Sequence, residues 1–234
     1  MITPRAAATV ALLRDGATGI ETYLLQRNPA LEFAPGASVF PGGAVDDDDL
    51  DDAWVQRCDG PTEAAATTEL GVPSGGLGYR VAAVRECFEE VGVLLGGPGG
   101  VDRQRRLATV CDRDGVRLAT ADLRYFGHWI TPEGAPRRYD TRFFFAVCPP
   151  DQQPEPDNDE ALAGHWVTPV AALAEAGEGR RDLITPTART LVALQALGDV
   201  ASVMAAVRRA GTTEQRRLLV PDHGGQRVRL PHDD

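Results

Sequence analysis

The chain has 234 residues, 43% of them hydrophobic, so it can bury a sizeable core as one domain and needs no second one. The formal net charge of −10 argues against a nucleic-acid backbone or an anionic membrane as its partner. Its four cysteines are far apart and form no CxxC pair, so neither a zinc site nor a disulfide framework is indicated.

The N-terminal segment predicts a hairpin followed by a glycine loop. Apolar runs at 6–14 and 21–27 are separated by the turn-forming residues DGATG, which is typical of a strand, a turn and a strand. A brief strand within 36–43 should then stop at the sequence Pro-Gly-Gly. Gly42 and Gly43 let the backbone approach a phosphate closely, although a tight turn without a ligand would need the same residues.

The composition changes between residues 44 and 78 to acidic, small and turn-forming residues. We interpret this segment as an insertion, with a short helix within 51–57 and no long periodic core segment. Trp54 is expected to anchor it to the body of the protein. The four aspartates at 46–49 could bind a metal ion, but a solvated acidic loop is the favoured interpretation.

Segment 80–93, RVAAVRECFEEVGV, predicts an amphipathic helix that ends at Gly92. Its apolar stripe consists of Val81, Val84, Phe88 and Val91. Glu86, Glu89 and Glu90 gather on another side, since residues three and four apart are neighbours on a helix surface.

These three carboxylates repel one another at such spacings, so a counter-charge is expected. A divalent cation such as Mg²⁺ would supply it, because carboxylates and substrate phosphates are its usual ligands. The alternative is a solvated acidic face that Arg80 and Arg85 partly balance. The order of residues around the acids, rather than their charge alone, favours the metal.

Downstream of this helix, the sequence predicts three strands and further helices. Two runs rich in aromatic and β-branched residues flank a polar linker and should therefore pair antiparallel. His128, Trp129 and Arg142 lie on or near them and are given no catalytic role. The expected elements are strands at 125–131, 141–148 and 164–168, a partly helical stretch at 102–122, and helices at 169–176 and 187–209, the last with a break at Gly198.

Residues 85–93 match the second half of the Nudix box, R-E-U-x-E-E-x-G-U, and the chain resembles the Nudix hydrolase family. In ordinary members a glycine begins the box, a glutamate follows six residues later, and the arginine comes eight residues after that. Counting back from Arg85 places Leu77 at the glutamate position, so the first half of the box is interrupted. Starting the box at Gly43 makes 44–78 an insertion inside it, which resembles the coenzyme A diphosphatase branch.

The likeness extends over most of residues 6–195. It includes YLLQRNPALEFAPGASVFPGG, RYDTRFFFAV, and WVTP followed by ITPTARTL. The resemblance implies an α/β fold, an α/β/α sandwich around a mixed β-sheet. It further implies a single domain over 1–234, with the insertion at about 44–78 and a C-terminal helical extension at about 186–234.

By this resemblance, Glu89 and Glu90 are the leading ligands of Mg²⁺ or Mn²⁺, and Glu86 is a third. Arg85 is a structural partner that holds an acid in place. Because the family's usual glutamate is missing, that acid is either one from the insertion or Glu86 itself.

Four further residues complete the expected site. Gly42 and Gly43 belong to the phosphate-binding loop, and Arg27 is placed to meet a substrate phosphate, although an exposed strand-end arginine is an equal alternative. Glu160 is the candidate general base, because family members often carry an acid ahead of the last core strand. The competing interpretation of Glu160 is an acid of a polar loop.

The resemblance implies hydrolysis of coenzyme A or acyl-coenzyme A to phosphopantetheine and adenosine 3′,5′-bisphosphate. The alternatives are hydrolysis of ADP-ribose or another nucleoside diphosphate-linked moiety, and a module that binds a nucleotide without cleaving it. Retention of all three clustered glutamates argues against the pure binder. We expect a cytoplasmic protein with a small-molecule nucleoside diphosphate substrate and neither nucleic acid nor membrane as partner; a homodimer is compatible with the apolar N-terminal hairpin.

Overall fold

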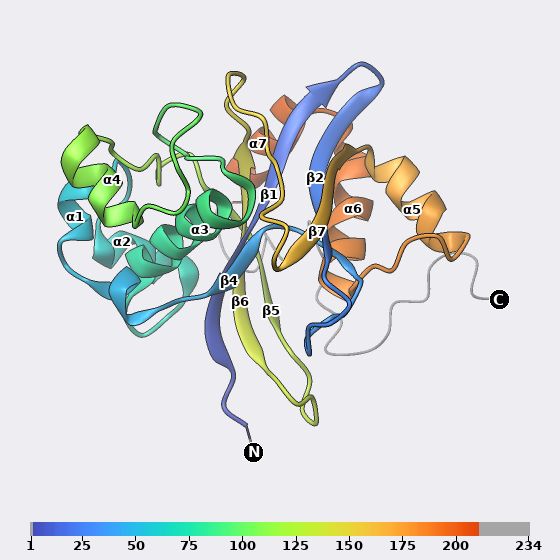
Figure 1. Cartoon of the computed structure of the whole chain (residues 1–234), viewed down its shortest axis with the longest axis horizontal. Helices are drawn as coiled ribbons and strands as arrows, with labels where there is room; N and C mark the ends of the chain where they lie inside the picture. Colours follow the sequence, from blue (N-terminus) through green and yellow to red (C-terminus); the bar gives the residue numbers. More distant parts are fainter. Residues whose placement is uncertain (1, 211–234) are drawn as a thin grey trace.

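A mixed seven-stranded sheet lies at the centre of the computed structural model, which describes residues 2–210 (Figure 1). The strands are β1 (Arg5–Gly16), β2 (Gly19–Arg27), β3 (Ser38–Val39), β4 (Gly42–Ala44), β5 (Arg124–Ile130), β6 (Tyr139–Val147) and β7 (Ala161–Val167). The strand order is β3-β2-β1-β6-β5, with β4 paired to β1 and β7 paired to β2. The β1–β2 and β5–β6 pairs are antiparallel, as predicted, while β1 and β6 run parallel at the centre.

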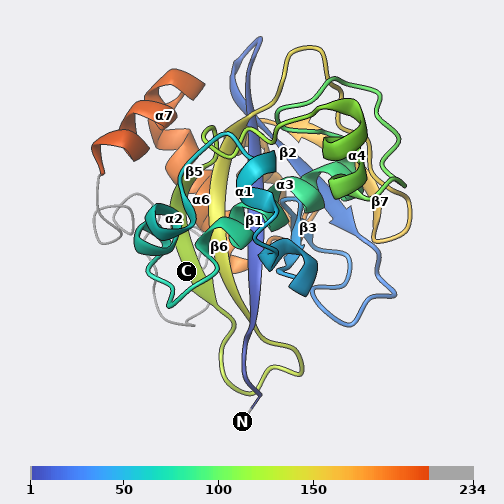
Figure 2. The same cartoon turned by 90° about the vertical axis from the view of Figure 1, so that its left-hand side faces the viewer.

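Helices cover both faces of this sheet. They are η1 (Asp47–Leu50), α1 (Trp54–Arg57), α2 (Glu63–Leu70), α3 (Gly76–Val91), α4 (Leu107–Asp114), α5 (Pro169–Gly177), α6 (Thr185–Leu197) and α7 (Val200–Arg209). Figure 1 shows α1 to α4 on one face and α5 and α6 on the other, and Figure 2 shows the first group from its own side. Helix α7 belongs to the second layer, because its buried residues share a hydrophobic cluster with those of α6. The predicted α/β/α sandwich around a mixed sheet is confirmed.

The central strand explains why the chain folds into two helical layers. Residues of β1 alternate between the two faces, and both faces are buried: Val10 and Leu12 pack under α3, while Leu13 packs towards α6 and α7. A strand that is buried on both faces has a nearly continuous apolar sequence, because neither face needs polar residues to contact water. The run at 6–14 therefore belongs to the middle of the sheet.

The insertion is anchored and partly helical. Trp54 is 4% exposed and its indole N–H donates to the Asp48 carbonyl at 2.7 Å, so the predicted anchor is confirmed. Helix α2 was not predicted, because only Ala66 and Leu70 of its residues are buried and its apolar periodicity is weak.

Helix α2 also caps the acidic helix. The Glu63 carboxylate accepts the backbone N–H groups of Gly75 (2.7 Å), Gly76 (3.1 Å) and Leu77 (2.8 Å) at the start of α3. The residue that would normally cap this helix is Gly75, which has no side chain to do so. Burial alone would raise the pKa of Glu63, but these hydrogen bonds and that of Thr67 outweigh it and lower the pKa. The insertion thus stabilises the end of α3 opposite its acids.

The predicted long C-terminal helix is two helices. Gly198, at φ +82°, ends α6, and Asp199 starts α7 by accepting the N–H of Ser202 at 2.7 Å. Among residues 2–210, no single helix has the length and apolar composition to cross a bilayer; α6 and α7 meet that test only when taken together, and they are bent by 105°. The predicted extension to residue 234 lies partly outside the described residues.

Candidate functional site

The acidic helix α3 is built as its sequence pattern predicts, although it begins four residues earlier. Its apolar stripe, Val81, Val84, Phe88 and Val91, is completely buried. Gly92 adopts φ +70° and donates its N–H to the Phe88 carbonyl at 2.9 Å, which ends the helix. Packing of the stripe against the sheet fixes the direction in which the glutamates point.

Gly42 and Gly43, predicted to form a loop, belong instead to the short strand β4, which pairs with β1. This segment, still called the glycine loop below, lies directly over the glutamates. The Gly42 N–H donates to Glu90 Oε2 at 2.8 Å, and Glu90 is only 7% exposed. A Cβ atom on Gly43 would lie 2.4 Å from Glu86 Oε1, and one on Gly42 would lie 2.4 Å from the Ala8 carbonyl oxygen. Both glycines are therefore required by close approach, to α3 and to β1, whatever ligand binds there.

Arg85 is the centre of the ion-pair network. Its guanidinium forms a bidentate pair with the Asp49 carboxylate: Nε donates to Oδ1 at 2.9 Å, and Nη2 donates to Oδ2 at 2.9 Å. Nη1 donates to Glu86 at 2.8 Å and to Glu89 at 3.0 Å, and Nη2 also donates to the Ala44 carbonyl at 2.9 Å. Burial alone would lower the pKa of Arg85, but Asp49 and the glutamates raise it above its usual value. Both predicted partners of Arg85, an insertion acid and Glu86, are confirmed together.

Asp49 corrects the interpretation of the acidic run. Asp47 and Asp48 are exposed, as a solvated loop requires, but Asp49 is 2% exposed and paired with Arg85. Asp49 lies six residues after Gly43, which is the spacing at which the Nudix box carries its glutamate. The sequence signal was therefore present when counted forward from the glycine, and was lost when counted backward from Arg85 to Leu77, a buried apolar residue.

The alternative counter-charge, Arg80, does not balance the acids of α3. It is 3% exposed, forms an ion pair with Glu69 of α2, and donates to the carbonyls of Thr120 (2.7 Å) and Leu123 (3.0 Å). Arg80 therefore supplies no counter-charge to Glu86 or Glu90. Burial raises the pKa of Glu86 to about 7, although Arg85 opposes the shift, and burial followed by the charge of Glu86 holds the pKa of Glu90 well above its usual range.

A divalent cation suits this charge and this set of oxygen donors. The side chains do not yet converge on one point, because Arg85 holds Glu86 and Glu89 while Glu90 bonds Gly42. Within residues 2–210, no three His, Cys, Asp or Glu side chains are arranged as a ready ligand set. The assignment of Glu86, Glu89 and Glu90 as metal ligands stays a prediction.

A cavity of about 1760 Å³ opens beside the glycine loop. Five of the predicted site residues line it: Arg27, Gly42, Gly43, Glu86 and Glu160. The walls also include the linker between β5 and β6 and the first residues of α6. The cavity thus joins the carboxylate end of α3 to segments from both helical layers.

A backbone hydrogen bond joins the segment that follows Arg27 to Glu160. The Glu160 carbonyl accepts the N–H of Asn28, the residue after Arg27, at 2.8 Å, and Arg27 itself donates from Nε to the Phe33 carbonyl at 3.1 Å. Burial is the main cause of the raised pKa values of Glu86 and Glu90, and the charge of Glu160 adds to both. Glu160 lines the same cavity as Glu86 and lies immediately before β7, as predicted.

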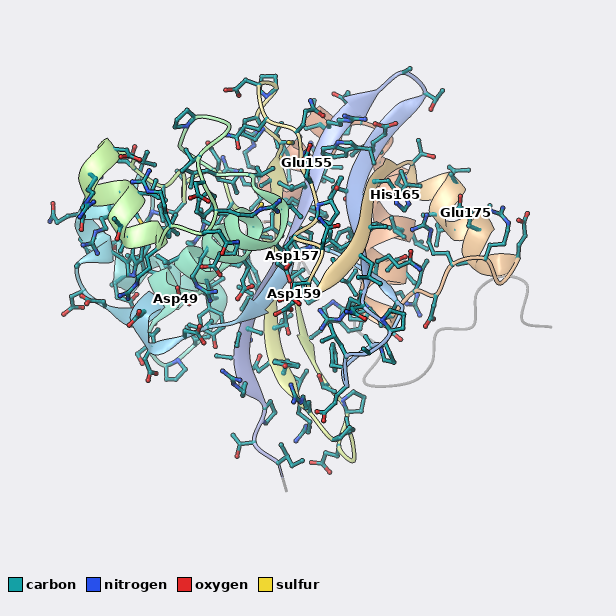
Figure 3. All side chains as sticks on the ribbon, viewed as in Figure 1. Asp49, Glu155, Asp157, Asp159, His165 and Glu175 are labelled. Atoms are coloured by element: carbon teal, nitrogen blue, oxygen red, sulfur yellow. The ribbon has the colours of Figure 1, made fainter. Side chains whose placement is uncertain are left out.

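The loop that carries Glu160 is ordered by Asp157. Its carboxylate accepts the N–H groups of Asp159 and Ala161 at 3.0 and 3.1 Å. Figure 3 labels Asp157 and Asp159 on this loop, between the two helical layers in that view, with Asp49 on the side of α1 to α4. His128 lines the same cavity as Glu160, and its Nε2 lies 2.5 Å from Asp140 Oδ1, so it is a paired histidine.

Gly43→Ala is expected to lower the catalytic turnover number (kcat) at least tenfold with little loss of fold stability. The new methyl group would overlap the Glu86 carboxylate, whose misplacement would weaken the site. Gly127→Ala in β5 is the matched control, because its Cβ would meet only ordinary contacts at 3.6 Å and beyond. Turnover and thermal midpoint (Tm) should be measured for both. Equal turnover in the two variants would contradict the placement of Glu86 at the reacting centre.

Comparisons with known proteins agree with this geometry. A NUDIX domain model matches residues 3–187. Acyl-coenzyme A diphosphatase NUDT19 of Gallus gallus is 30% identical over 237 aligned positions, covering 72% of this chain and 62% of that protein. The Homo sapiens protein of the same name is 30% identical over 207 positions, covering 67% and 55%. The chain therefore spans less than two thirds of the length of these relatives.

Among solved structures, a NUDIX hydrolase from Alicyclobacillus acidocaldarius superposes with a TM-score of 0.71 at 30% identity. The match covers 88% of this chain and 97% of that one. The sheet and both helical layers thus have a counterpart of nearly the same extent.

Proposed function

The chain belongs to the NUDIX family, and from that premise we propose that it is a divalent-metal-dependent hydrolase of a phosphoanhydride bond in a small nucleotide-derived substrate. The observation that carries the proposal is the Arg85 network, which holds the α3 glutamates under the Gly42–Gly43 loop at one end of a large cavity. A pure nucleotide binder would have no need of buried carboxylates with raised pKa values.

Glu86, Glu89 and Glu90 are the proposed ligands of Mg²⁺ or Mn²⁺. Such ions, when bound, polarise phosphorus, activate water and neutralise the leaving phosphate. Arg85 positions Glu86 and Glu89 through its Nη1 hydrogen bonds, and the Gly42 N–H orients Glu90. The glycine loop leaves room for a diphosphate above these side chains, and the Arg27 guanidinium at the cavity wall is proposed to bind one of its oxygens.

Glu160 is proposed as the general base. In the reaction, a water oxygen bonds to one phosphorus, the bridging P–O bond breaks, and the Glu160 carboxylate takes the water proton. Its exposure in the cavity wall keeps it accessible to water, whereas Glu86 is only partly exposed and Glu90 is buried. Asp157 holds the backbone around it, which limits where that carboxylate can reach.

The proposed substrate is coenzyme A or an acyl-coenzyme A. The support is the name of the relatives, acyl-coenzyme A diphosphatase, together with a cavity long enough to have one wall on α3 and another on α6. Cleavage would yield phosphopantetheine, or its acyl derivative, and adenosine 3′,5′-bisphosphate.

A substrate panel tests this proposal. The full chain should cleave coenzyme A with Mg²⁺ or Mn²⁺ to the two stated products, and should lose activity in EDTA. ADP-ribose and a dinucleoside polyphosphate serve as competitors, with products identified by mass spectrometry. Rapid turnover of ADP-ribose beside intact coenzyme A would overturn the substrate, and no metal-dependent cleavage of any member would overturn the hydrolase.

A further inference from the structure

The start of α6 forms one wall of the cavity, about 100 residues after the carboxylates in the sequence. Thr185, Pro186 and Thr187 line the cavity together with the glycine loop. Helix α6 has 13 residues, and its N-cap residue is Ile184, whose side chain cannot cap the helix. The first backbone N–H groups of a helix lack partners within it and carry partial positive charge, so they attract anions. At the start of α6 these groups belong to Thr185 and Thr187, because Pro186 has no N–H.

Thr187 supplies a second polar group at the same place. The residue is 1% exposed and lines the cavity, and its hydroxyl oxygen is not among the fully buried unpartnered atoms of residues 2–210, so the little exposure it has lets the hydroxyl reach the cavity. One turn further on, Thr190 is also buried but donates its hydroxyl to the Pro186 carbonyl at 2.8 Å. No hydrogen bond within residues 2–210 uses the Thr187 hydroxyl, so its O–H can donate to an acceptor oxygen of a ligand in the cavity.

The start of α6 is tied to the glycine loop through β3. Ser38 pairs with Leu183 in a parallel bridge, and its N–H donates to the Asp182 carbonyl at 2.8 Å. Ser38 and Gly42 are four positions apart, so their Cα atoms are separated by at most about 14 Å. One extended ligand in this cavity can therefore contact both the glycine loop and the start of α6.

The charges around this end are mixed. Arg27, Arg137 and Arg138 line the cavity, and so do the acids Glu32, Glu133 and Asp182. Glu32 is neutralised by Arg137 at 2.7 Å, whereas the exposed Asp182 opposes an anion. Binding at the start of α6 must therefore come from directed hydrogen bonds rather than from the general field.

We propose that the N-terminus of α6, with the Thr187 hydroxyl, is a second phosphate subsite that receives the 3′-phosphate of an adenosine 3′,5′-bisphosphate group. This inference rests on the proposed function, because it assigns the nucleotide end of that substrate. It explains how a coenzyme A-type substrate is distinguished from a nucleoside diphosphate that lacks the extra phosphate.

Binding of three nucleotides to the full chain in EDTA tests the subsite without relying on catalysis. Isothermal titration should show that adenosine 3′,5′-bisphosphate binds at least about tenfold more tightly than adenosine 5′-phosphate, as expected for a hydrogen bond to a charged group. Adenosine 2′,5′-bisphosphate has the same charge and should bind more weakly than the 3′,5′ isomer. Thr187→Val, which keeps the shape and removes the hydroxyl, should reduce the tenfold preference to about threefold or less.

Thr190→Val is the matched control, because it makes the same change on the same helix at a hydroxyl that already has a protein partner. It should keep the full preference, and the Tm of both variants should be recorded. Absence of a 3′-phosphate preference in the unaltered chain, or equal loss in the two variants, would overturn the subsite. If the chain prefers the bisphosphate but does not cleave coenzyme A, the subsite is supported. That result would contradict only the proposed reaction.

Discussion

Glu90→Gln is expected to lower kcat about a thousandfold, because a proposed metal ligand is lost and each tenfold corresponds to about 1.4 kcal/mol of barrier. The fold should survive. Burial raises the pKa of the Glu90 carboxyl, so at neutral pH its ionised form opposes folding, and a neutral amide removes that opposition. In EDTA the Tm of the variant should therefore equal or exceed that of the unaltered chain.

A metal titration separates this loss from damage to the fold. Mg²⁺ or Mn²⁺ should raise the Tm of the unaltered chain, because a ligand that binds only the folded state stabilises it, and should raise that of Glu90→Gln much less. Glu178→Gln, the same change at an exposed residue after α5, should leave turnover and the metal response unaltered. Undiminished activity of Glu90→Gln would remove Glu90 from the proposed ligand set.

Asp49→Ala is expected to lower the free energy of unfolding by about 3 kcal/mol, which is typical when one partner of a buried ion pair is removed. The Asp49 side chain is 1% exposed and that of Arg85 is 14% exposed, so solvent screens the pair weakly. The Tm should fall by about 6–12 °C for a chain of this size. Turnover should fall as well, because Arg85 also positions Glu86 and Glu89.

The neighbouring Asp48 offers a matched control. Its side chain is 77% exposed and pairs with Arg106 at the surface, and such pairs contribute at most about 1 kcal/mol. Asp48→Ala should therefore change the Tm only slightly, and Asp49→Glu should recover part of the loss by restoring a carboxylate. Equal destabilisation by Asp48→Ala and Asp49→Ala in chemical denaturation would contradict the structural role of the Asp49–Arg85 pair.

Asp49 shows why a correct motif was only half interpreted. Its spacing from Gly43 is local and visible in the sequence, but its partner Arg85 follows 36 positions later, beyond the inserted segment. No periodicity connects residues so far apart, and four consecutive aspartates look alike until packing buries one of them. The same limit explains α2, whose pattern is weak although its Glu63 caps α3.

The C-terminal helices α6 and α7 could also be predicted only in part. The sequence predicted helix on both sides of Gly198, since alanine and leucine favour helix and glycine does not. The sequence did not predict the angle of 105° between the two helices, because that angle depends on how each helix packs on the sheet. The place of Thr187 in a cavity wall likewise follows from the β3 bridge and not from its neighbours in sequence.

The sequence by itself determined the hairpin, the acidic helix, its glycine end and the NUDIX family, because side-chain periodicity and motif spacing are local properties of the chain. The tertiary structure alone decided which aspartate pairs with Arg85, that the insertion caps α3, and that Arg27, Glu86, Glu160 and the start of α6 share one cavity. Ion pairs and cavities depend on segments that are distant in sequence and are brought together only when both faces of the sheet are packed.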